Sequence, residues 1–257
     1  MIDNGMGLEG ESAYPYTAAD GTCTKSTSQY KAFITAWHQI STDETQIAAA
    51  VQQYGPLSIG INANTFQTYS SGVADPLFCN PAALDHGVAI VGFGTASGKD
   101  YWTIRNSWGS SWGEAGYIRM IRGSGKCGLN TDVTTATGVS TALAAPEPKQ
   151  YAKGFVRMPR NAAVPVGTIS DEDRAAAPAK LDYTTTGATS DVKDQGSCGS
   201  CWAFSATQGI ESAVFRATGT MPKLSTQQII ACDKTDGGCN GGDLPTAFDY
   251  VESDGGI

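Results

Sequence analysis

The sequence predicts an α+β fold, because helical and strand-like patterns concentrate in different parts of its 257 residues. Apolar side chains recur every three or four positions between residues 201 and 218, which is typical of a helix. Runs rich in β-branched, aromatic and other apolar residues occupy much of the stretch from 57 to 121 and predict strands. We therefore expect a helical part and a strand-rich part.

Four helices are expected from periodicity and end signals. The pattern at 43–53 predicts the first helix, and the stripe at 201–218 predicts a long one closed by Gly219. Ser225 followed by Gln228 resembles a capping box, which predicts a short helix running through Ala231. The last helix is expected at 244–252. Strands are expected at 57–61, 87–93, 101–105 and 117–121.

Composition limits the classes of protein and partner. A hydrophobic content of 40% with 31 glycines is typical of a compact, loop-rich chain, long enough for one large or two medium globular units. The net charge of −8 argues against nucleic acid as a partner. No apolar run approaches the ~20 residues of a membrane span, so no membrane partner is expected. The acidity suits a secreted, lysosomal or vacuolar setting.

The chain has seven cysteines, at positions 23, 79, 127, 198, 201, 232 and 239. An odd number leaves one thiol over if the others form disulfides, and the sequence alone cannot choose the pairs. Cys198 and Cys201 could also form a redox pair or half of a zinc site. No second Cys-X-X-Cys or histidine pair completes a metal shell, so neither a metal nor another cofactor is expected.

Three blocks of sequence carry candidate chemistry. Residues 195–205 read Gln-Gly-Ser-Cys-Gly-Ser-Cys-Trp-Ala-Phe-Ser, which places Cys201 at the beginning of the long helical pattern. Residues 84–92 read Leu-Asp-His-Gly-Val-Ala-Ile-Val-Gly, a buried-strand pattern entered through His86. Residues 101–109 read Tyr-Trp-Thr-Ile-Arg-Asn-Ser-Trp-Gly, a second strand that ends in polar residues and glycine.

Each candidate has a plainer interpretation. A cysteine at a helix start is more often a buried core residue, and a lone histidine is more often structural. The surrounding motifs reverse that preference for Cys201 and His86, whereas His38 has no motif around it and is expected to be structural. Gly92, Gly94 and Gly98 superficially suggest a phosphate-binding loop, but no helix follows, so a turn at a strand end is preferred.

Together the blocks resemble those of papain-like, cathepsin-type cysteine proteases, whose signature is Cys-Gly-[Ser/Ala]-Cys-[Trp/Tyr]. The resemblance covers about 215 residues. It implies a two-lobe fold, with a helical lobe beside an antiparallel β-barrel-like lobe and the active site in the cleft between them. It also implies the disulfides Cys198–Cys239, Cys23–Cys232 and Cys79–Cys127, which would leave Cys201 free and indicate an oxidising compartment.

The order of the blocks is reversed relative to this family, in which the cysteine block comes first. If the end of the chain were joined to its start, His86 would follow Cys201 by about 140 residues, within the ~130–150 typical of the family. We therefore expect a circular permutant; an engineered protein and a fragment of a tandem-protease gene would both give this order. Residues 1–137 would form the strand-rich lobe and part of the helical lobe. Residues 138–178 would form a linker or propeptide-tail connector, and 179–257 the helical lobe with the nucleophile.

The resemblance implies cysteine endopeptidase chemistry. A thiol at a helix N-terminus beside a histidine has a lowered pKa, so Cys201 would act as a thiolate paired with a His86 imidazolium. Asn106 would orient the imidazole and Trp108 would shield that contact from water. The Gln195 side chain and the backbone N–H of Cys201 would bind the oxyanion, and the reaction would pass through an acyl-enzyme. Family exopeptidases carry a histidine-bearing occluding loop, for which no histidine pair is present here.

The resemblance also implies a set of substrate-binding residues around the pocket for the second residue before the scissile bond. They are Gly60, Leu84, Asp85, Trp108, Asp132, Gly241, Gly242, Asp243 and Leu244. Gly241 and Gly242 would present backbone to an extended substrate. Asp132, five positions after Cys127, would form the pocket floor and favour basic as well as hydrophobic side chains; alternatively it points to solvent.

Peptide or protein substrates and proteinaceous cysteine-protease inhibitors are the expected partners, and the chain is expected to be a monomer. The connector would relate it to a zymogen if it includes the tail of a propeptide, and part of it could lie along the cleft and slow substrate entry. The alternative from another class is a catalytically silent or linker-blocked binding homologue on the same fold. The four intact residues Cys201, His86, Asn106 and Gln195 favour the active form.

Overall fold

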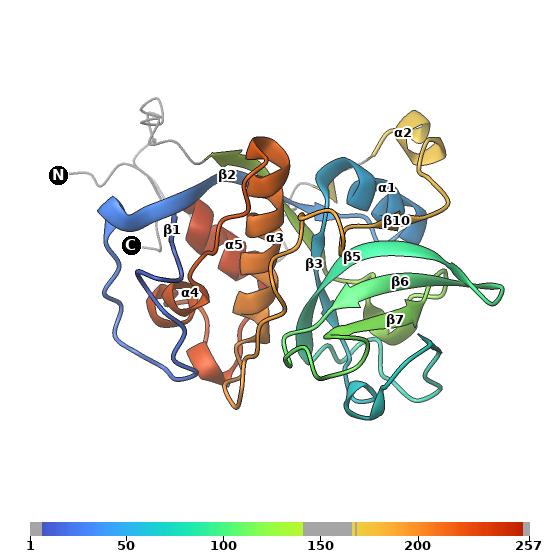
Figure 1. Cartoon of the computed structure of the whole chain (residues 1–257), viewed down its shortest axis with the longest axis horizontal. Coiled ribbons are helices and arrows are strands. Elements are labelled where there is room, and N and C mark those ends of the chain that lie inside the picture. Colours follow the sequence, from blue (N-terminus) through green and yellow to red (C-terminus); the bar gives the residue numbers. More distant parts are fainter. Residues whose placement is uncertain (1–6, 141–165, 168, 254–257) are drawn as a thin grey trace.

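Helix α3 (Cys201–Thr218) lies in the middle of the molecule, between the two shorter helices that follow it in the chain and the main group of strands (Figure 1). The structure is a computed structural model that describes residues 7–140, 166, 167 and 169–253. Within these ranges it contains α1 (Glu44–Tyr54), α2 (Asp171–Ala175), α3, α4 (Thr226–Cys232) and α5 (Leu244–Ser253). The four helices expected from the sequence are confirmed, and the mixed α+β class with them.

The helix ends follow the predicted signals with one difference. The Asp43 carboxylate accepts a hydrogen bond from Thr45 N (2.8 Å) at the start of α1, and Gly219 closes α3 with a φ of +73°. Ser225 accepts from Gln228 N (3.0 Å), as in a capping box. The reciprocal half is absent, because the Gln228 side chain instead bonds Glu9 N and Gly7 O. The predicted capping box is therefore only half formed.

The strands form one open sheet in the order β1-β2-β8-β3-β5-β6-β7-β4, with β10 added to β5 and β9 to β2. All pairs are antiparallel except β4 with β7 and β9 with β2. The longer strands are β2 (Tyr30–Ile40), β3 (Leu57–Ile61), β5 (His86–Ala96), β6 (Lys99–Arg105), β7 (Tyr117–Ile121) and β8 (Val133–Ser140). The short ones are β1 (Leu8–Glu9), β4 (Val73–Ala74), β9 (Val166–Gly167) and β10 (Leu181–Asp182). The four expected strands are confirmed.

The four short strands and two of the longer ones, β2 and β8, were not expected; β2 and β8 pair with each other from Phe33 with Ser140 to Gln39 with Thr134. β2 carries Lys31, His38 and Gln39 among its apolar residues and does not alternate cleanly. β8 reads Val-Thr-Thr-Ala-Thr-Gly-Val-Ser, with few large apolar side chains. Register shifts interrupt their pairing near Ala36, which also weakens a period-two pattern in the sequence.

The core consists of two hydrophobic clusters. One contains apolar residues of α1, β3, β5, β6 and β7, including Ile47, Ile59, Ile90 and Trp102. The other contains residues of β1, β2 and helices α3 to α5, including Trp37, Ile210 and Phe248. Because α3 also contacts β3, β5 and β8, its buried face joins the two groups.

Parts of the expected connector 138–178 pack against the rest of the chain, although α2 has no buried residue. Gly138 to Ser140 belong to β8, and Val166 and Gly167 pair with Gln39 and Ile40. Ile169 is 4% exposed and lies in the first hydrophobic cluster. Residues 141–165, and hence the proposed contact of this segment with the cleft, lie outside the described residues.

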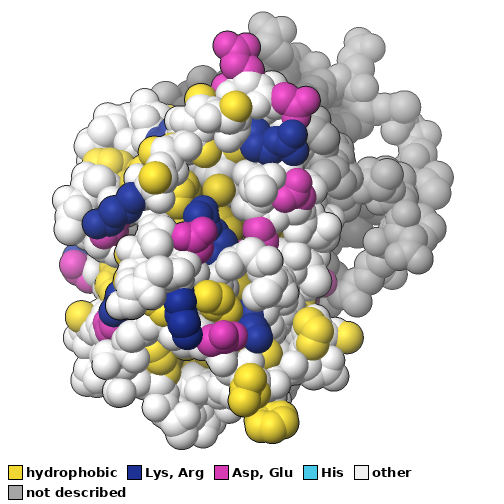
Figure 2. Space-filling model, turned by 90° about the vertical axis from the view of Figure 1, so that its right-hand side faces the viewer, with side chains coloured by type: hydrophobic (Ala, Val, Ile, Leu, Met, Phe, Trp, Pro, Cys, Tyr) yellow, Lys and Arg dark blue, Asp and Glu magenta, His cyan; other side chains and the backbone are white. Residues whose placement is uncertain are grey.

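The surface has no extended field of one charge on the face over the strands. Figure 2 shows Lys and Arg side chains interspersed with Asp and Glu on that face. Within the described ranges, no helix is both long enough and apolar enough to cross a bilayer.

Candidate active site

Cys201 is the first residue of α3 and the only cysteine without a disulfide partner among the described residues. The structure joins Cys23 to Cys232, Cys79 to Cys127 and Cys198 to Cys239, the same three pairs that the resemblance implies. The Cys201 side chain is partly exposed. A helix N-terminus with a free, accessible thiol is a favourable place for a thiolate.

Opposing effects act on the thiol. Burial raises the pKa of Cys201, whereas the backbone N–H groups of Gly87, Trp202 and Cys201 itself lower it, and the nearby Asp85 carboxylate raises it again. The net effect on the pKa of Cys201 is upward. These backbone groups alone therefore do not make a thiolate, and a cation must contribute if one is to form.

His86 opens β5 and its ring is held by three neighbours. Its Nε2 lies 2.7 Å from Asn106 Oδ1, and the Trp108 ring lies 4.9 Å from the imidazole between ring centroids. The Phe66 ring is nearly perpendicular to the imidazole, with 6.2 Å between the ring centroids. Burial lowers the pKa of His86, while the bond to Asn106 and the Asp85 charge raise it less.

Asn106 fixes the tautomer of this ring. Its Oδ1 also accepts from Ser107 N (2.8 Å), so this oxygen is oriented as an acceptor and His86 Nε2 must donate. Asn106 is 3% exposed, and its Nδ2 has no partner in the described part of the chain. The arrangement leaves Nδ1 of His86 as the nitrogen that can exchange a proton.

The cysteine and histidine blocks meet at Gly87. A Cβ on this glycine would lie 2.9 Å from Cys201 O and 3.0 Å from Trp202 Cα, so only glycine permits this approach of β5 to α3. Ser205 Oγ donates to Val88 O (2.6 Å), and Ser58 Oγ donates to Ser205 O (2.7 Å). The first two contacts thus hold β5, next to His86, against α3, and the third ties β3 to the same helix.

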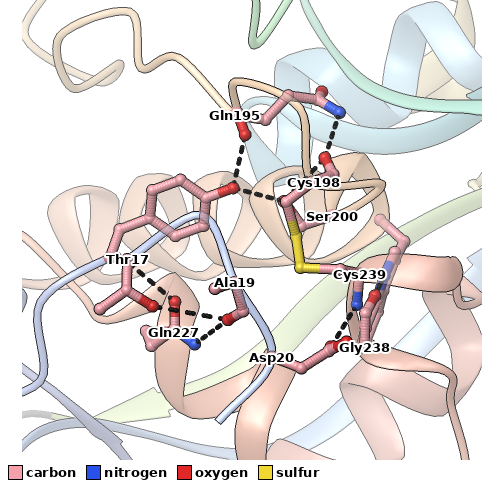
Figure 3. Close-up of a disulfide and its surroundings, with 11 residues drawn as sticks. Thr17, Ala19, Asp20, Gln195, Cys198, Ser200, Gln227, Gly238 and Cys239 are labelled. Atoms are coloured by element: carbon pink, nitrogen blue, oxygen red, sulfur yellow. Dashed lines mark hydrogen bonds between the residues drawn. A yellow bond between two sulfur atoms is a disulfide. The ribbon is translucent and has the colours of Figure 1, made fainter.

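Gln195 is fixed in the loop before Cys201. Its backbone N donates to Ser107 O (2.9 Å), its Oε1 accepts from Ser107 Oγ (2.7 Å), and its Nε2 donates to Cys198 O (3.0 Å). Figure 3 shows the Gln195 side chain over the Cys198–Cys239 disulfide. One N–H of the side-chain amide remains for another acceptor.

Two residues that hold this loop from elsewhere in the chain were missed by the sequence reasoning. Ser107, between Asn106 and Trp108, orients the Gln195 amide. Tyr16 OH donates to Gln195 O (2.7 Å) and lies 2.8 Å from Ser200 Oγ. The Asn-Ser-Trp-Gly block could have indicated Ser107. No local signal near Tyr16 relates it to a loop about 180 residues further along the chain.

The predicted pocket residues gather in part. A Cβ on Gly60 would lie 2.9 Å from the Leu84 side chain and 3.6 Å from Asp132 Oδ2, so Gly60, Leu84 and Asp132 adjoin one another. The Asp132 carboxyl faces that of Asp243 and does not point freely to solvent. Burial, and then Asp243, raise the pKa of Asp132 to about 7. Asp132 Oδ1 is buried and receives no hydrogen bond in the described structure.

Other predicted pocket residues have different surroundings. Leu244 is buried at the start of α5, with 3% exposure, and no described contact joins it to Gly60. The Asp85 carboxylate accepts from Ala63 N (2.7 Å) and Asn62 Nδ2 (3.3 Å), so it fixes the two residues that follow β3. Gly242 is exposed, but a Cβ on it would lie 2.6 Å from the Trp202 ring.

Neither His38 nor any group of possible metal ligands in the described ranges suggests a second functional site. His38 lies in β2 opposite Thr135 of β8, away from the residues above. In the described ranges, no group of three or more His, Cys, Asp or Glu side chains is placed to hold a metal ion.

Comparison with known proteins finds a matching family model and relatives that are cysteine proteases by name. A family model described as papain family cysteine protease matches residues 1–137 and 177–257. Cysteine proteinase 1 of Zea mays is 46% identical over 144 residues, covering 52% of this chain and 38% of that protein. Cathepsin F of Mus musculus is 44% identical over 137 residues, covering 52% of this chain and 30% of that protein.

A solved structure similar to this chain in sequence and shape is also known. It is the digestive procathepsin L2 proteinase from the larval midgut of Tenebrio molitor, with a TM-score of 0.50 and 35% sequence identity. The match covers 51% of this chain and 43% of that one. The chain thus spans less than half the length of each of these relatives.

Proposed function

The chain belongs to the papain family of cysteine proteases, and on that premise we propose that it is an endopeptidase that hydrolyses peptide bonds with Cys201 as nucleophile. The observation that carries the proposal is the free Cys201 thiol at the start of α3, packed against the residue that follows His86. The bond between His86 and Asn106 supplies the orientation that a general acid–base needs.

The Cys201 thiolate and the His86 imidazolium would stabilise each other. Burial disfavours the thiolate of Cys201 and the imidazolium of His86 when each is charged alone. Transfer of the thiol proton to Nδ1 creates both charges at once, and opposite charges in contact stabilise one another strongly where water is scarce. The Trp108 ring packs against the His86 imidazole and would limit that water.

The proposed reaction has two steps. Cys201 Sγ attacks the carbonyl carbon, Nδ1–H of His86 protonates the leaving nitrogen, and the C–N bond breaks to give a thioester. Water then attacks the thioester carbon while His86 takes one of its protons, and the C–S bond breaks to restore the thiolate and release the acid. Gln195 Nε2 and the Cys201 N–H would donate to the oxyanion in both steps.

We propose that the blocks are circularly permuted and fold within one chain as two lobes with a cleft between them. The two hydrophobic clusters support the lobes, and the family match in two segments on either side of 138–176 supports the reversed order. The proposed units are 1–137, the connector 138–178, and 179–257 with the nucleophile. The Cys23–Cys232 disulfide links the first and third of these.

The proposed substrate pocket accepts hydrophobic and basic side chains. Leu84 supplies apolar surface, while Asp132 and Asp243 supply carboxyl groups at one side. The exposed backbone of Gly242 would pair with an extended peptide. Gly241 beside it is half-buried, and its own backbone groups bond Gly237 N and Gly238 O. The single histidine outside the site, His38, lies in β2 and cannot serve an occluding loop, which favours internal cleavage.

Proteins and peptides are the proposed substrates, and protein inhibitors of cysteine proteases the proposed regulators of a monomer. Three disulfides favour a secreted, lysosomal or vacuolar location. The procathepsin neighbour supports the idea that part of 138–178 derives from a propeptide.

Labelling with a thiol-reactive epoxide, followed by peptide mapping, tests the activity. We expect one label per chain, on Cys201, and loss of peptidase activity in parallel with labelling. A Cys201→Ser variant is the control and should neither label nor hydrolyse. Complete labelling without any hydrolysis of denatured protein would favour the silent homologue instead.

A further inference from the structure

The Tyr16 hydroxyl joins the two segments that carry the proposed oxyanion donors. It donates to Gln195 O (2.7 Å) and lies 2.8 Å from Ser200 Oγ. Gln195 carries the side-chain amide proposed as one donor, and Ser200 directly precedes Cys201, whose backbone N–H is the other. One hydroxyl group therefore connects the residues on which the position of both donors depends.

The direction of these two hydrogen bonds follows from the hydrogens available. A phenol has one hydrogen and a carbonyl oxygen can only accept, so Tyr16 donates to Gln195 O and Ser200 Oγ donates to Tyr16. The other acceptor near Ser200 Oγ, Cys198 O, is further away at 3.4 Å. Hydrogen bonds in series polarise one another, so each of the two strengthens the other.

The electrostatics of Tyr16 agree with this direction. Burial raises the pKa of Tyr16, the bond from Ser200 lowers it by less, and the Asp194 charge raises it again. A bond that lowers the pKa is expected from a donor to the phenolic oxygen. Because the net pKa is raised, the hydroxyl keeps its proton at acidic and neutral pH and remains a donor to Gln195 O.

Tyr16 is itself held by residues outside the loop that it bonds. Its backbone N donates to Glu11 Oε1 (2.8 Å), and Thr17 N donates to Gln227 Oε1 (2.9 Å). Its ring packs edge-on against Phe204 of α3, with 4.8 Å between the ring centroids. These contacts place the hydroxyl independently of Gln195 and Ser200.

The loop around Gln195 is thus fixed from two sides. Ser107 bonds the backbone N and the side-chain Oε1 of Gln195, and Tyr16 bonds its backbone O. Figure 3 shows Gln195 and Ser200 beside the Cys198–Cys239 disulfide. An oxyanion site stabilises charge only if its donors are already in place, and a displacement of about 1 Å can cost about 10²-fold in rate.

We propose that Tyr16 is a positioning residue for the oxyanion site, and that its hydroxyl holds the Gln195 side-chain amide and the Cys201 N–H at the separation that a tetrahedral intermediate requires. The inference rests on the proposed endopeptidase function. Tyr16 does not touch the reacting atoms, because its hydroxyl bonds the main chain of Gln195 and the side chain of Ser200.

Steady-state kinetics of Tyr16→Phe on one peptide test the proposal. This substitution keeps the ring against Phe204 and removes only the hydroxyl. We expect kcat to fall about 5- to 50-fold with KM within about twofold of the wild type, because the lost bond acts in the transition state. An unchanged kcat would overturn the proposal.

A double variant shows whether Tyr16 acts through Gln195. The loss of kcat in Tyr16→Phe should be smaller than that in Gln195→Ala, which removes a donor itself. The double variant should lose less than the product of the two single losses, because both substitutions affect the same donor. Losses that multiply would show that the two residues act independently and would contradict the proposed role.

Tyr14→Phe is the matched control. It removes the hydroxyl of the other tyrosine in the same Tyr-Pro-Tyr run, which donates to Thr22 O (3.1 Å) and accepts from Thr24 N (3.2 Å). Neither partner belongs to the loop around Gln195, so kcat should stay within about twofold of the wild type. Thermal stability should fall by a similar amount in both variants. An equal loss of kcat in both would mean that Tyr16 acts only through general stability.

The reaction of Cys201 with dipyridyl disulfide separates the oxyanion site from the nucleophile. The Cys201 thiolate attacks one sulfur, the S–S bond breaks and a pyridinethiolate leaves, so no carbonyl oxyanion forms. The rate of this reaction and its pH profile should therefore be the same in Tyr16→Phe as in the wild type. A slower reaction or a shifted profile would make Tyr16 a support of the thiolate and would overturn its assignment to the oxyanion site.

Amide hydrogen exchange tests the tether without catalysis. Gln195 N donates to Ser107 O and Ser200 N donates to Cys198 O, so these two amides report the order of the loop. Their protection should fall about 5- to 50-fold in Tyr16→Phe and stay unchanged in Tyr14→Phe. Equal protection in the wild type and Tyr16→Phe would refute the tether even in an active enzyme. A wild-type protein that neither labels at Cys201 nor hydrolyses peptides would instead refute the activity alone.

Discussion

At the scale of single residues, the proposed chemistry depends on proton positions that few atoms control. Asn106 accepts from His86 and from Ser107 N through one oxygen, and this decides which imidazole nitrogen is protonated. The sequence indicated His86, Asn106 and Cys201 through their motifs. It could not indicate the support from Tyr16 or the Asp132–Asp243 pair, because those contacts join residues far apart along the chain.

Gln195 and Ser107 should differ in the size of their effects. Gln195→Ala removes a proposed oxyanion donor and should lower kcat by about 10²–10³-fold. Ser107→Ala removes only the donor that orients Gln195 Oε1, and should lower kcat by about 10-fold or less. Steady-state kinetics on one peptide, with KM reported separately, would check both. Equal losses for the two variants would contradict the supporting role of Ser107.

The Asp132–Asp243 pair should make specificity depend on pH. The pKa of Asp132 is raised to about 7, by burial first and by Asp243 second, so the pocket gains negative charge as the pH rises through that value. The ratio of kcat/KM for Arg- over Leu-bearing substrates should therefore increase from pH 5.5 to 8.

Asp132→Ala should flatten that increase, and the control measurement is the Leu substrate alone, whose kcat/KM should change little on substitution. An Arg-to-Leu ratio that rises equally in Asp132→Ala would count against the pocket assignment. A raised carboxyl pKa also means that Asp132 contributes less to stability as the pH rises from about 4 through 7.

At the scale of elements, the regular patterns were predictable and the pairing was not. The stripe of α3 and the caps Asp43 and Ser225 are local signals, and each predicted helix was found. The β2–β8 pair was missed, because its residues are about 100 positions apart and neither strand alternates clearly. Gln228 bonds β1 instead of closing its own cap, which only tertiary structure explains.

Gly87→Ala tests the contact that joins β5 to α3. The added Cβ would meet backbone atoms of Cys201 and Trp202, which cannot move aside as a side chain could. We expect a loss of about 1–3 kcal/mol in the free energy of unfolding, with a large loss of kcat because His86 shifts. Gly21→Ala is the matched control, since its nearest neighbour, Gln227 Nε2, would be 3.9 Å away. Equal thermal stability and kcat in both variants would contradict the packing argument.

At the scale of the whole molecule, a disulfide joins the two halves of the proposed permutant. Cys23 and Cys232 are 209 residues apart in sequence and lie in the first and third proposed units. The resemblance implied this pair, whereas composition and spacing alone left the pairing open. The order of the blocks was visible in the sequence, but their assembly within one chain required three-dimensional structure.

Cutting the chain within residues 145–165, at an introduced protease site, should leave the two pieces linked. Non-reducing electrophoresis should show one species and reducing electrophoresis two, because Cys23–Cys232 bridges the cut. Activity on a small peptide should stay within about twofold of the uncut protein if the connector does not obstruct the cleft. Separation of the pieces without reductant would contradict the assembly.

The most direct test of the central claim is intrachain crosslinking of Cys201 to His86 by a bifunctional alkylating reagent with a span of a few ångströms. We predict a single crosslinked peptide pair within one chain, formed in parallel with loss of activity and absent from Cys201→Ser. Alkylation of Cys201 without any bridge to His86, or a bridge found only between two chains, would contradict the account.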